Sequence, residues 1–123
     1  MQDQSVRGDK IKLRVGSNSF AVTLLDSEAT KRFKDMFPLT VRMKDLHGNE
    51  KYYDLPNALP TQASNPDAIK TGDIMLYGSN TLVLFYKSFS TSYSYTRLGQ
   101  VADPSKLESA LGSGDVTLTF EFD

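Results

Sequence analysis

The sequence of 123 residues contains no cysteine and no tryptophan, and it has one histidine, His47. The lack of cysteine excludes a disulfide framework, a thiolate zinc site and a cysteine redox site. One histidine excludes a histidine-rich metal site, and a serine–histidine–acid triad would need a residue that stands beside Gly48 in a predicted turn. We therefore expect no metal site and no cofactor.

An excess of charge of one sign is also missing, since 14 Lys and Arg residues face 15 Asp and Glu residues, for a formal net charge of -1. Nucleic acid is not an expected partner, because binding to its phosphates needs a basic excess. No stretch approaches the roughly 18 consecutive apolar residues of a membrane span. A membrane-spanning segment is therefore not expected either.

Residues 1–9 are polar and lack the apolar centre of a signal peptide. We expect them to form a flexible N-terminal segment before a single domain over residues 10–123. The protein is then cytoplasmic, or exported if residues 1–9 are the remnant of a trimmed export or lipoprotein signal.

Strand patterns dominate what is present. Residues 10–15 and 20–24 alternate polar and apolar side chains around Gly16, Ser17 and Asn18, a pattern typical of a hairpin. Alternation returns in residues 39–44, 51–55 and 116–123. By contrast, residues 73–77 and 82–86 are almost continuously apolar, which predicts strands covered on both faces. A long irregular connection with three prolines is expected over residues 56–69.

Two short helices are predicted between the strands. Asp26 or Ser27 is suited to cap the first, which places Ala29, Phe33, Met36 and Phe37 on one face before Pro38 ends it. In the second, Asp103 is the expected cap, Pro104 the first helical residue and Gly112 the stop. About eight strands with two short helices predict a mostly antiparallel, closed or nearly closed β-barrel capped by the helices.

The order of these elements resembles the small bacterial cyclophilin-like proteins, which are known mainly as a fold. The residues that carry the resemblance are GDIMLY at 72–77, LVLFY at 82–86 and TSYSYTRLG at 91–99. The resemblance covers nearly the whole chain and implies a cyclophilin-like barrel.

True cyclophilins are prolyl cis/trans isomerases that bind an X-Pro segment on the barrel wall and place an arginine near the prolyl nitrogen. The resemblance implies Arg42 for this role, because Val41 and Met43 are expected to face inward and leave Arg42 facing out. However, Thr40-Val41 stands where cyclophilins have Phe-His, and Tyr52-Tyr53-Asp54 replaces their Gln-Gly-Gly. The tryptophan and histidine of the proline pocket have no obvious counterparts. A weak peptidyl-prolyl isomerase using Arg42 is therefore an alternative, and it is the one enzyme class with support.

A binding surface is predicted in residues 88–97, where aromatic residues and Arg97 share one parity while Ser and Thr residues share the other. If the aromatic face is outward, it offers rings for stacking and a guanidinium for a carbonyl or an anion. If it is inward, the tyrosines are ordinary core residues. The candidate ligand-binding residues on the outer barrel groove, including two from the rim of the proline-bounded loop, are Arg42, Thr61, Gln62, Phe89, Tyr93, Tyr95 and Arg97.

Three acidic residues, Asp45, Glu50 and Asp54, flank the turn at His47 and could form a carboxylate pair or a weak cation site. Next to lysines they are expected to belong to a solvated hairpin end. We therefore predict a non-catalytic binding module for a small molecule or an extended peptide, as a monomer or a weak dimer. A further alternative, drawn from related barrels, is an accessory interaction domain of a larger, flavin-carrying partner.

Overall fold

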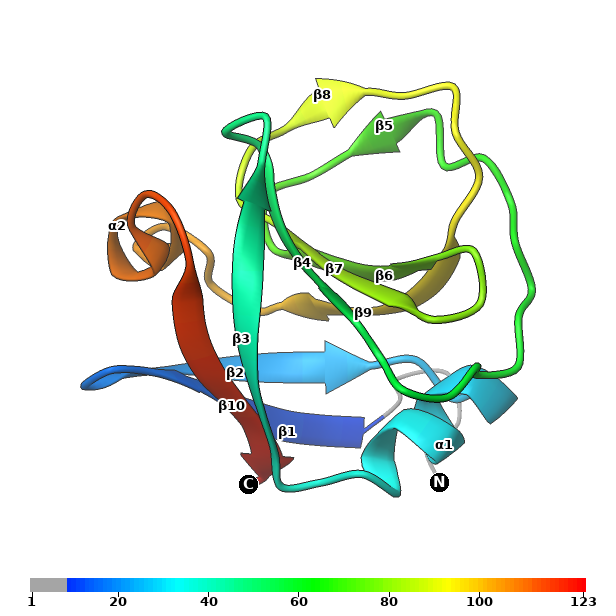
Figure 1. Ribbon diagram of the computed structural model, residues 1–123, viewed down its shortest axis with the longest axis horizontal. Helices are drawn as coiled ribbons and strands as arrows, with labels where there is room; N and C mark the ends of the chain where they lie inside the picture. The colour runs from blue at the N-terminus through cyan, green and yellow to red at the C-terminus, as the bar shows by residue number, and fades with distance from the viewer. Residues whose placement is uncertain (1–8) are drawn as a thin grey trace, which may run out of the picture.

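A closed antiparallel barrel of eight strands forms the body of the protein in the computed structural model, which describes residues 9–123 (Figure 1). Its strands follow the order β1-β10-β3-β4-β7-β6-β9-β2, and β5 and β8 form a separate two-stranded sheet. The expected fold class is thus confirmed. The expected flexible segment 1–9 lies outside the described residues except for Asp9, which is the first residue of β1.

The elements have the following bounds: β1 Asp9–Val15, β2 Asn18–Leu24, α1 Glu28–Lys34, β3 Leu39–Leu46, β4 Glu50–Asp54, β5 Ala68–Ile69, β6 Asp73–Tyr77, β7 Thr81–Phe85, β8 Phe89–Ser90, β9 Thr96–Val101, α2 Leu107–Leu111 and β10 Val116–Phe122. Helices α1 and α2 lie on opposite sides of the barrel (Figure 1). In residues 9–123, no helix is long and apolar enough to cross a membrane.

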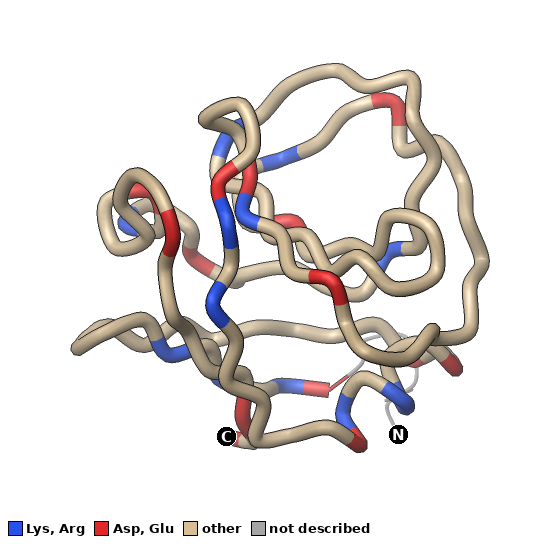
Figure 2. Tube along the Cα trace, viewed as in Figure 1, with Lys and Arg blue, Asp and Glu red and all other residues tan. Residues whose placement is uncertain are grey.

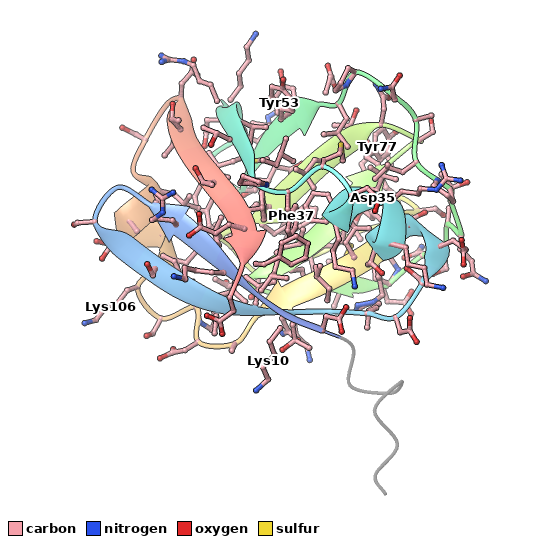
Figure 3. The ribbon with its side chains drawn as sticks, turned by 90° about the horizontal axis from the view of Figure 1, so that it is seen from below. Lys10, Asp35, Phe37, Tyr53, Tyr77 and Lys106 are labelled. Atoms are coloured by element: carbon pink, nitrogen blue, oxygen red, sulfur yellow. The ribbon has the colours of Figure 1, made fainter. Side chains whose placement is uncertain are left out.

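The first helix begins as its sequence predicts. The Ser27 hydroxyl accepts a hydrogen bond from the Thr30 amide at 3.2 Å, and the Thr30 hydroxyl accepts one from the Ser27 amide at 3.1 Å. This reciprocal cap satisfies two amides that have no partner inside the helix. Phe33 of α1 is buried in the barrel core, and its ring lies 5.0 Å from the ring of Phe37, which Figure 3 labels at this end of the barrel.

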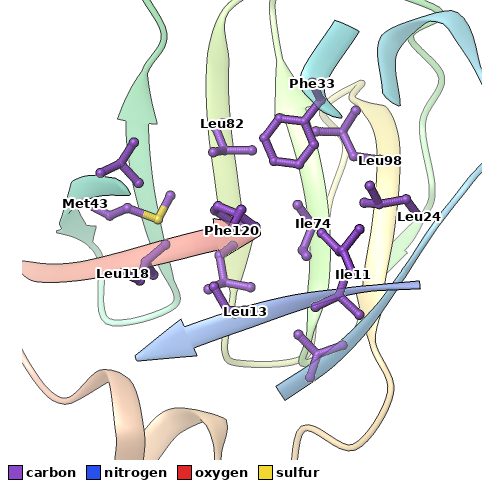
Figure 4. Close-up of a cluster of buried hydrophobic side chains, with 14 of the residues drawn as sticks. Ile11, Leu13, Leu24, Phe33, Met43, Ile74, Leu82, Leu98, Leu118 and Phe120 are labelled. Carbon is purple, nitrogen blue, oxygen red and sulfur yellow. The ribbon is translucent and has the colours of Figure 1, made fainter. Parts of the chain in front are cut away.

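The barrel interior is filled by the inward side chains of the barrel strands, as the alternation predicts. Leu13, Val41, Leu118 and Phe120 come from β1, β3 and β10 and belong to the same core cluster as Phe33 of α1. Figure 4 shows Phe33 above Leu13, Leu118 and Phe120. The Phe33 and Phe120 rings pack edge to face at 5.2 Å, which is a favourable geometry for two aromatic rings. This core leaves the functional surface to the outside of the barrel.

Strands β6 and β7 are buried on both faces, as their continuous apolar runs predict. Ile74, Leu82 and Leu84 face the interior, whereas Val83 and Phe85 face outward. The outward residues belong to a second apolar cluster, here called the outer cluster: Ile69, Met75, Val83, Phe85 and Tyr95, with Tyr52 and Phe89 packed against them. The small β5–β8 sheet covers this wall, lying above β7 and β6 in Figure 1.

Two predicted elements differ from the structure. Helix α2 starts at Leu107 instead of Pro104. The Asp103 carboxylate accepts a hydrogen bond from the Ser105 amide at 3.3 Å, as the expected cap would, but residues 104–107 form a separate turn in which the Leu107 amide donates to the Pro104 carbonyl oxygen at 3.0 Å. The expectation that residues 88–97 form one strand with two alternating faces is also wrong, since β8 ends at Ser90 and β9 begins at Thr96. In between, the Thr91 hydroxyl accepts a hydrogen bond from the Tyr93 amide, a local turn that competes with extended structure.

Candidate functional site

A cavity of about 610 Å³ opens on the outer wall of the barrel and is here called the outer groove. Its floor is formed by side chains of β4 and β7, one side by the turn between β3 and β4, and the other by the segment from β8 to Tyr95. The lining residues are Leu46, His47, Asn49, Glu50, Tyr52, Asp54, Tyr77, Thr81, Val83, Phe89, Ser90, Thr91, Ser92, Tyr93 and Tyr95. The volume falls within the range of about 300–1,000 Å³ that is usual for small-molecule sites.

Aromatic rings from four parts of the chain form the walls. The Tyr77 ring lies 6.1 Å from Tyr93 and 5.7 Å from Tyr95, which in turn packs edge to face on Phe85 at 5.6 Å. Tyr95 is buried, and burial raises the pKa of its hydroxyl despite the opposing contact with the Thr91 hydroxyl. Tyr95 is therefore a fixed wall, whereas Tyr93, 61% exposed, stands at the mouth.

The mouth gathers exposed apolar surface. Five large hydrophobic side chains are exposed in residues 9–123, and Leu46, Tyr77 and Tyr93 among them all line the outer groove. A concentration of exposed apolar groups around one cavity is typical of a binding site, whereas scattered single residues carry no such meaning.

Glu50 is the one acidic side chain that is largely buried in the groove, with 9% of its surface exposed. Its register opposite Phe85 of β7 turns it toward the outer wall. Burial raises the pKa of its carboxyl, an effect opposed by His47 and reinforced by Asp45. The prediction that the acids at this hairpin are solvated is thus wrong for Glu50, because the outer cluster and the turn cover it.

Lys51, the next residue, faces the opposite way and is fully buried at the α2 end of the barrel. Its ammonium donates to the carbonyl oxygens of Gly112 at 2.9 Å and Gly114 at 2.6 Å, and it pairs with Asp45 at 3.1 Å. The Tyr86 hydroxyl also donates to Asp45, which lowers the pKa of that carboxyl, while burial and this bond raise the pKa of Tyr86 to about 12. Because the Lys51 ammonium has three protein oxygens as partners, we interpret this network as one that stabilises the fold and does not bind a ligand.

The predicted site residues are divided by the structure. Phe89, Tyr93 and Tyr95 line the outer groove. Thr61, Gln62 and Arg97 line a different cavity of about 740 Å³, here called the second cavity, between the start of α1 and residues 60–64. The two cavities share a wall, because Ser64 of the second cavity and Tyr95 of the outer groove pair through both backbone groups.

Arg42 lies outside both cavities. As expected, it faces out of the barrel between the buried Val41 and Met43. Its side chain is 72% exposed and pairs with Asp115 at 3.3 Å, at the start of β10. The guanidinium is thus directed along the β3–β10 side of the wall, and it does not line the outer groove.

Three groove residues were not predicted from the sequence: Glu50, Tyr52 and Tyr77. The sequence does contain a sign of this. Glu50 and Tyr52 are two positions apart on β4 and so face the same side of the sheet, and β4 pairs with β7, which is buried on both faces. No group of three or more potential metal-ligating side chains is found in the part of the chain that the structure describes.

Comparisons with known proteins agree on the fold. A family model described as the Cyclophilin-like family matches residues 13–121. The solution structure of a hypothetical protein from Archaeoglobus fulgidus superimposes with a TM-score of 0.70 over 100% of both chains, at 17% sequence identity. The comparison with curated proteins gave no match.

Proposed function

The chain belongs to the Cyclophilin-like family, and we propose that its outer groove is a non-catalytic binding site for a small molecule or an extended peptide. The family description defines a fold and not an activity, so the proposal depends on the groove itself. The observation that supports it most is the coincidence of a cavity of about 610 Å³ with three exposed apolar side chains at its mouth.

The construction of the groove favours binding over reaction. Its polar lining consists of hydroxyls, an amide, one histidine and two carboxylates, and no serine, histidine and acid are hydrogen-bonded to one another among the described residues. The rings of Tyr77, Tyr93 and Tyr95 provide contact area for a ligand. Binding costs little side-chain conformational entropy, because each tyrosine has only two side-chain torsions to fix.

The first experiment is a thermal-shift screen of small metabolites and short peptides. A ligand that binds the native state stabilises it by about 2.7 kcal/mol at a concentration of 100 times its Kd. Tyr93→Ala should reduce or abolish the shift, and Phe122→Ala is the matched control, since Phe122 is 58% exposed and does not line the groove. A ligand whose shift is equal in wild type and Tyr93→Ala but lost in Arg97→Ala would move the site to the second cavity. A screen without any hit would favour the accessory interaction role.

A peptidyl-prolyl isomerase that uses Arg42 remains the enzymatic alternative. It requires the guanidinium at the prolyl nitrogen of a peptide lying on the wall around β3. A proline-peptide isomerisation assay on wild type and Arg42→Ala separates the two functions. Equal rates at background level would remove the enzyme, whereas a wild-type rate lost in Arg42→Ala would establish it.

A further inference from the structure

The Glu50 carboxyl is an unsatisfied group in the outer groove. No donor in residues 9–123 hydrogen-bonds it, and its surroundings act on it through burial and through the charges of His47 and Asp45. Buried acidic groups are usually paired, because removing a carboxylate from water without a partner is costly. Here the missing partner has a place to sit, since the carboxyl lines a cavity that is open to solvent.

The other groups around the cavity favour a positively charged partner. Neither lysine nor arginine lines the groove, and its second carboxylate, Asp54, accepts one hydrogen bond from Thr81 at 2.8 Å. Lys44 lies opposite Tyr52 in register but is exposed and does not line the groove. The segment 88–96 is free of charged residues, and its part of the chain has neither blue nor red in Figure 2.

The aromatic walls add to the same preference. Tyr52, Tyr77, Phe89, Tyr93 and Tyr95 all line the groove. The faces of such rings carry negative electrostatic potential and attract cations, most strongly ammonium groups that have shed part of their water. A carboxylate at the base and rings at the sides together suit an organic cation better than a neutral or anionic ligand.

We infer that the ligand of the outer groove is a small organic cation, whose ammonium pairs with Glu50 while its apolar part lies against Tyr77, Tyr93 and Tyr95. This inference rests on the proposed function and specifies the chemical class of the ligand. The groove selects against anions, because a bound carboxylate would face Glu50 and Asp54, and His47 is the one basic side chain in the lining.

The test is a titration of ¹⁵N-labelled protein with three compounds that share one ring: benzyltrimethylammonium, benzyl alcohol and benzoate. The cation should bind tightest and benzoate weakest, with the largest amide shifts near Glu50, Tyr52 and Tyr95. Glu50→Gln preserves shape and removes charge, and it should weaken the cation by about tenfold or more while leaving benzyl alcohol nearly unchanged. Glu121→Gln is the matched control, since Glu121 of β10 does not line the groove and pairs with Arg14 at 3.1 Å.

The same titration at several pH values and salt concentrations supplies a second readout. Binding of the cation should strengthen as pH rises through the ionisation of Glu50, because the cation pairs with the ionised carboxyl. The titratable groups around Glu50 include His47 from the turn, Asp45 from β3, Asp54 from β4, Tyr86 directly after β7 and Tyr95 from the facing segment. Added salt should weaken the cation more than the alcohol.

The outcomes separate the inference from the proposed function. If benzyl alcohol or benzoate binds the groove as well as the cation, or if Glu50→Gln leaves cation binding unchanged, the inference is wrong but the groove is still a binding site. If none of the compounds shifts the groove residues, the inference is overturned, and the library screen then decides the proposed function. Tyr93→Ala, a change at an exposed side chain, tests the ring contribution should Glu50→Gln disturb folding, and unchanged cation binding in it would contradict the role of the rings.

Discussion

Replacing Lys51 by methionine tests how the barrel is closed beside α2. Methionine keeps most of the apolar stem in its buried position but removes the ammonium. Two hydrogen bonds to the carbonyl oxygens of Gly112 and Gly114 and the ion pair with Asp45 are then lost. The contact of the ammonium with the Tyr86 ring, at 5.3 Å from the centroid, is lost as well.

The cost follows from these contacts. A hydrogen bond to a charged group contributes about 1.5–3 kcal/mol, so two of them set an upper range of about 3–6 kcal/mol. Gly112 and Gly114 are exposed and recover water as a partner, and Asp45 keeps its bonds from Tyr86 and the Gly48 amide. We therefore expect Lys51→Met to lower the free energy of unfolding by about 3 kcal/mol. With an unfolding entropy of about 2.1 cal/mol/K per residue, this corresponds to a fall in Tm of about 12 °C.

Urea unfolding followed by circular dichroism measures this difference, with calorimetry for Tm. The matched control is Lys44→Met, because Lys44 is an exposed lysine on the adjacent strand, and its loss should change stability by no more than about 0.5 kcal/mol. A loss below about 1 kcal/mol in Lys51→Met would refute the reasoning, since it would mean that the ammonium gains nothing over water from its buried partners.

Three further perturbations have defined outcomes. Gly99→Ala should destabilise the barrel by about 3 kcal/mol in urea unfolding, because a Cβ there would lie 2.4 Å from the Thr23 carbonyl oxygen where β9 meets β2; a neutral result would contradict this packing. Glu50→Gln should be more stable than wild type at neutral pH, and the difference should shrink as pH falls toward the ordinary carboxyl range, because a raised folded pKa makes stability decline with rising pH. Tyr86→Phe should raise the pKa of Asp45 in an NMR titration, so that stability is lost at a higher pH during acidification; an unchanged Asp45 titration would exclude the proposed bond as the cause.

The sequence predicted the barrel well because its signals are local and repeated. The hairpin of β1 and β2, the cap at Ser27 and the two-sided burial of β6 and β7 each follow from side-chain periodicity or hydrogen-bonding chemistry within a few residues. Even the outward direction of Arg42 follows from the parity of β3. These features do not depend on how distant segments meet.

The groove was predicted less completely because it depends on contacts between segments that are far apart in the sequence. The parity of residues 88–97 places Tyr93, Tyr95 and Arg97 on one face, but the turn at Thr91 breaks the strand and sends Arg97 to the second cavity. In the sequence, Glu50 has the pattern of a surface acid beside lysines, and it is buried only because the outer cluster packs over it. Lys51 is a similar case, since its partners at Gly112 and Gly114 lie more than sixty positions along the chain.

The most direct test of the proposed binding site is the position at which a ligand from the screen contacts the labelled protein. If the ligand binds in the outer groove, amide shifts should concentrate on Glu50, Tyr52, Tyr93 and Tyr95, and they should disappear from this set in Tyr93→Ala. Shifts confined to Thr61, Gln62 and Arg97, or spread along the Arg42 side of the wall, would contradict the proposed binding site.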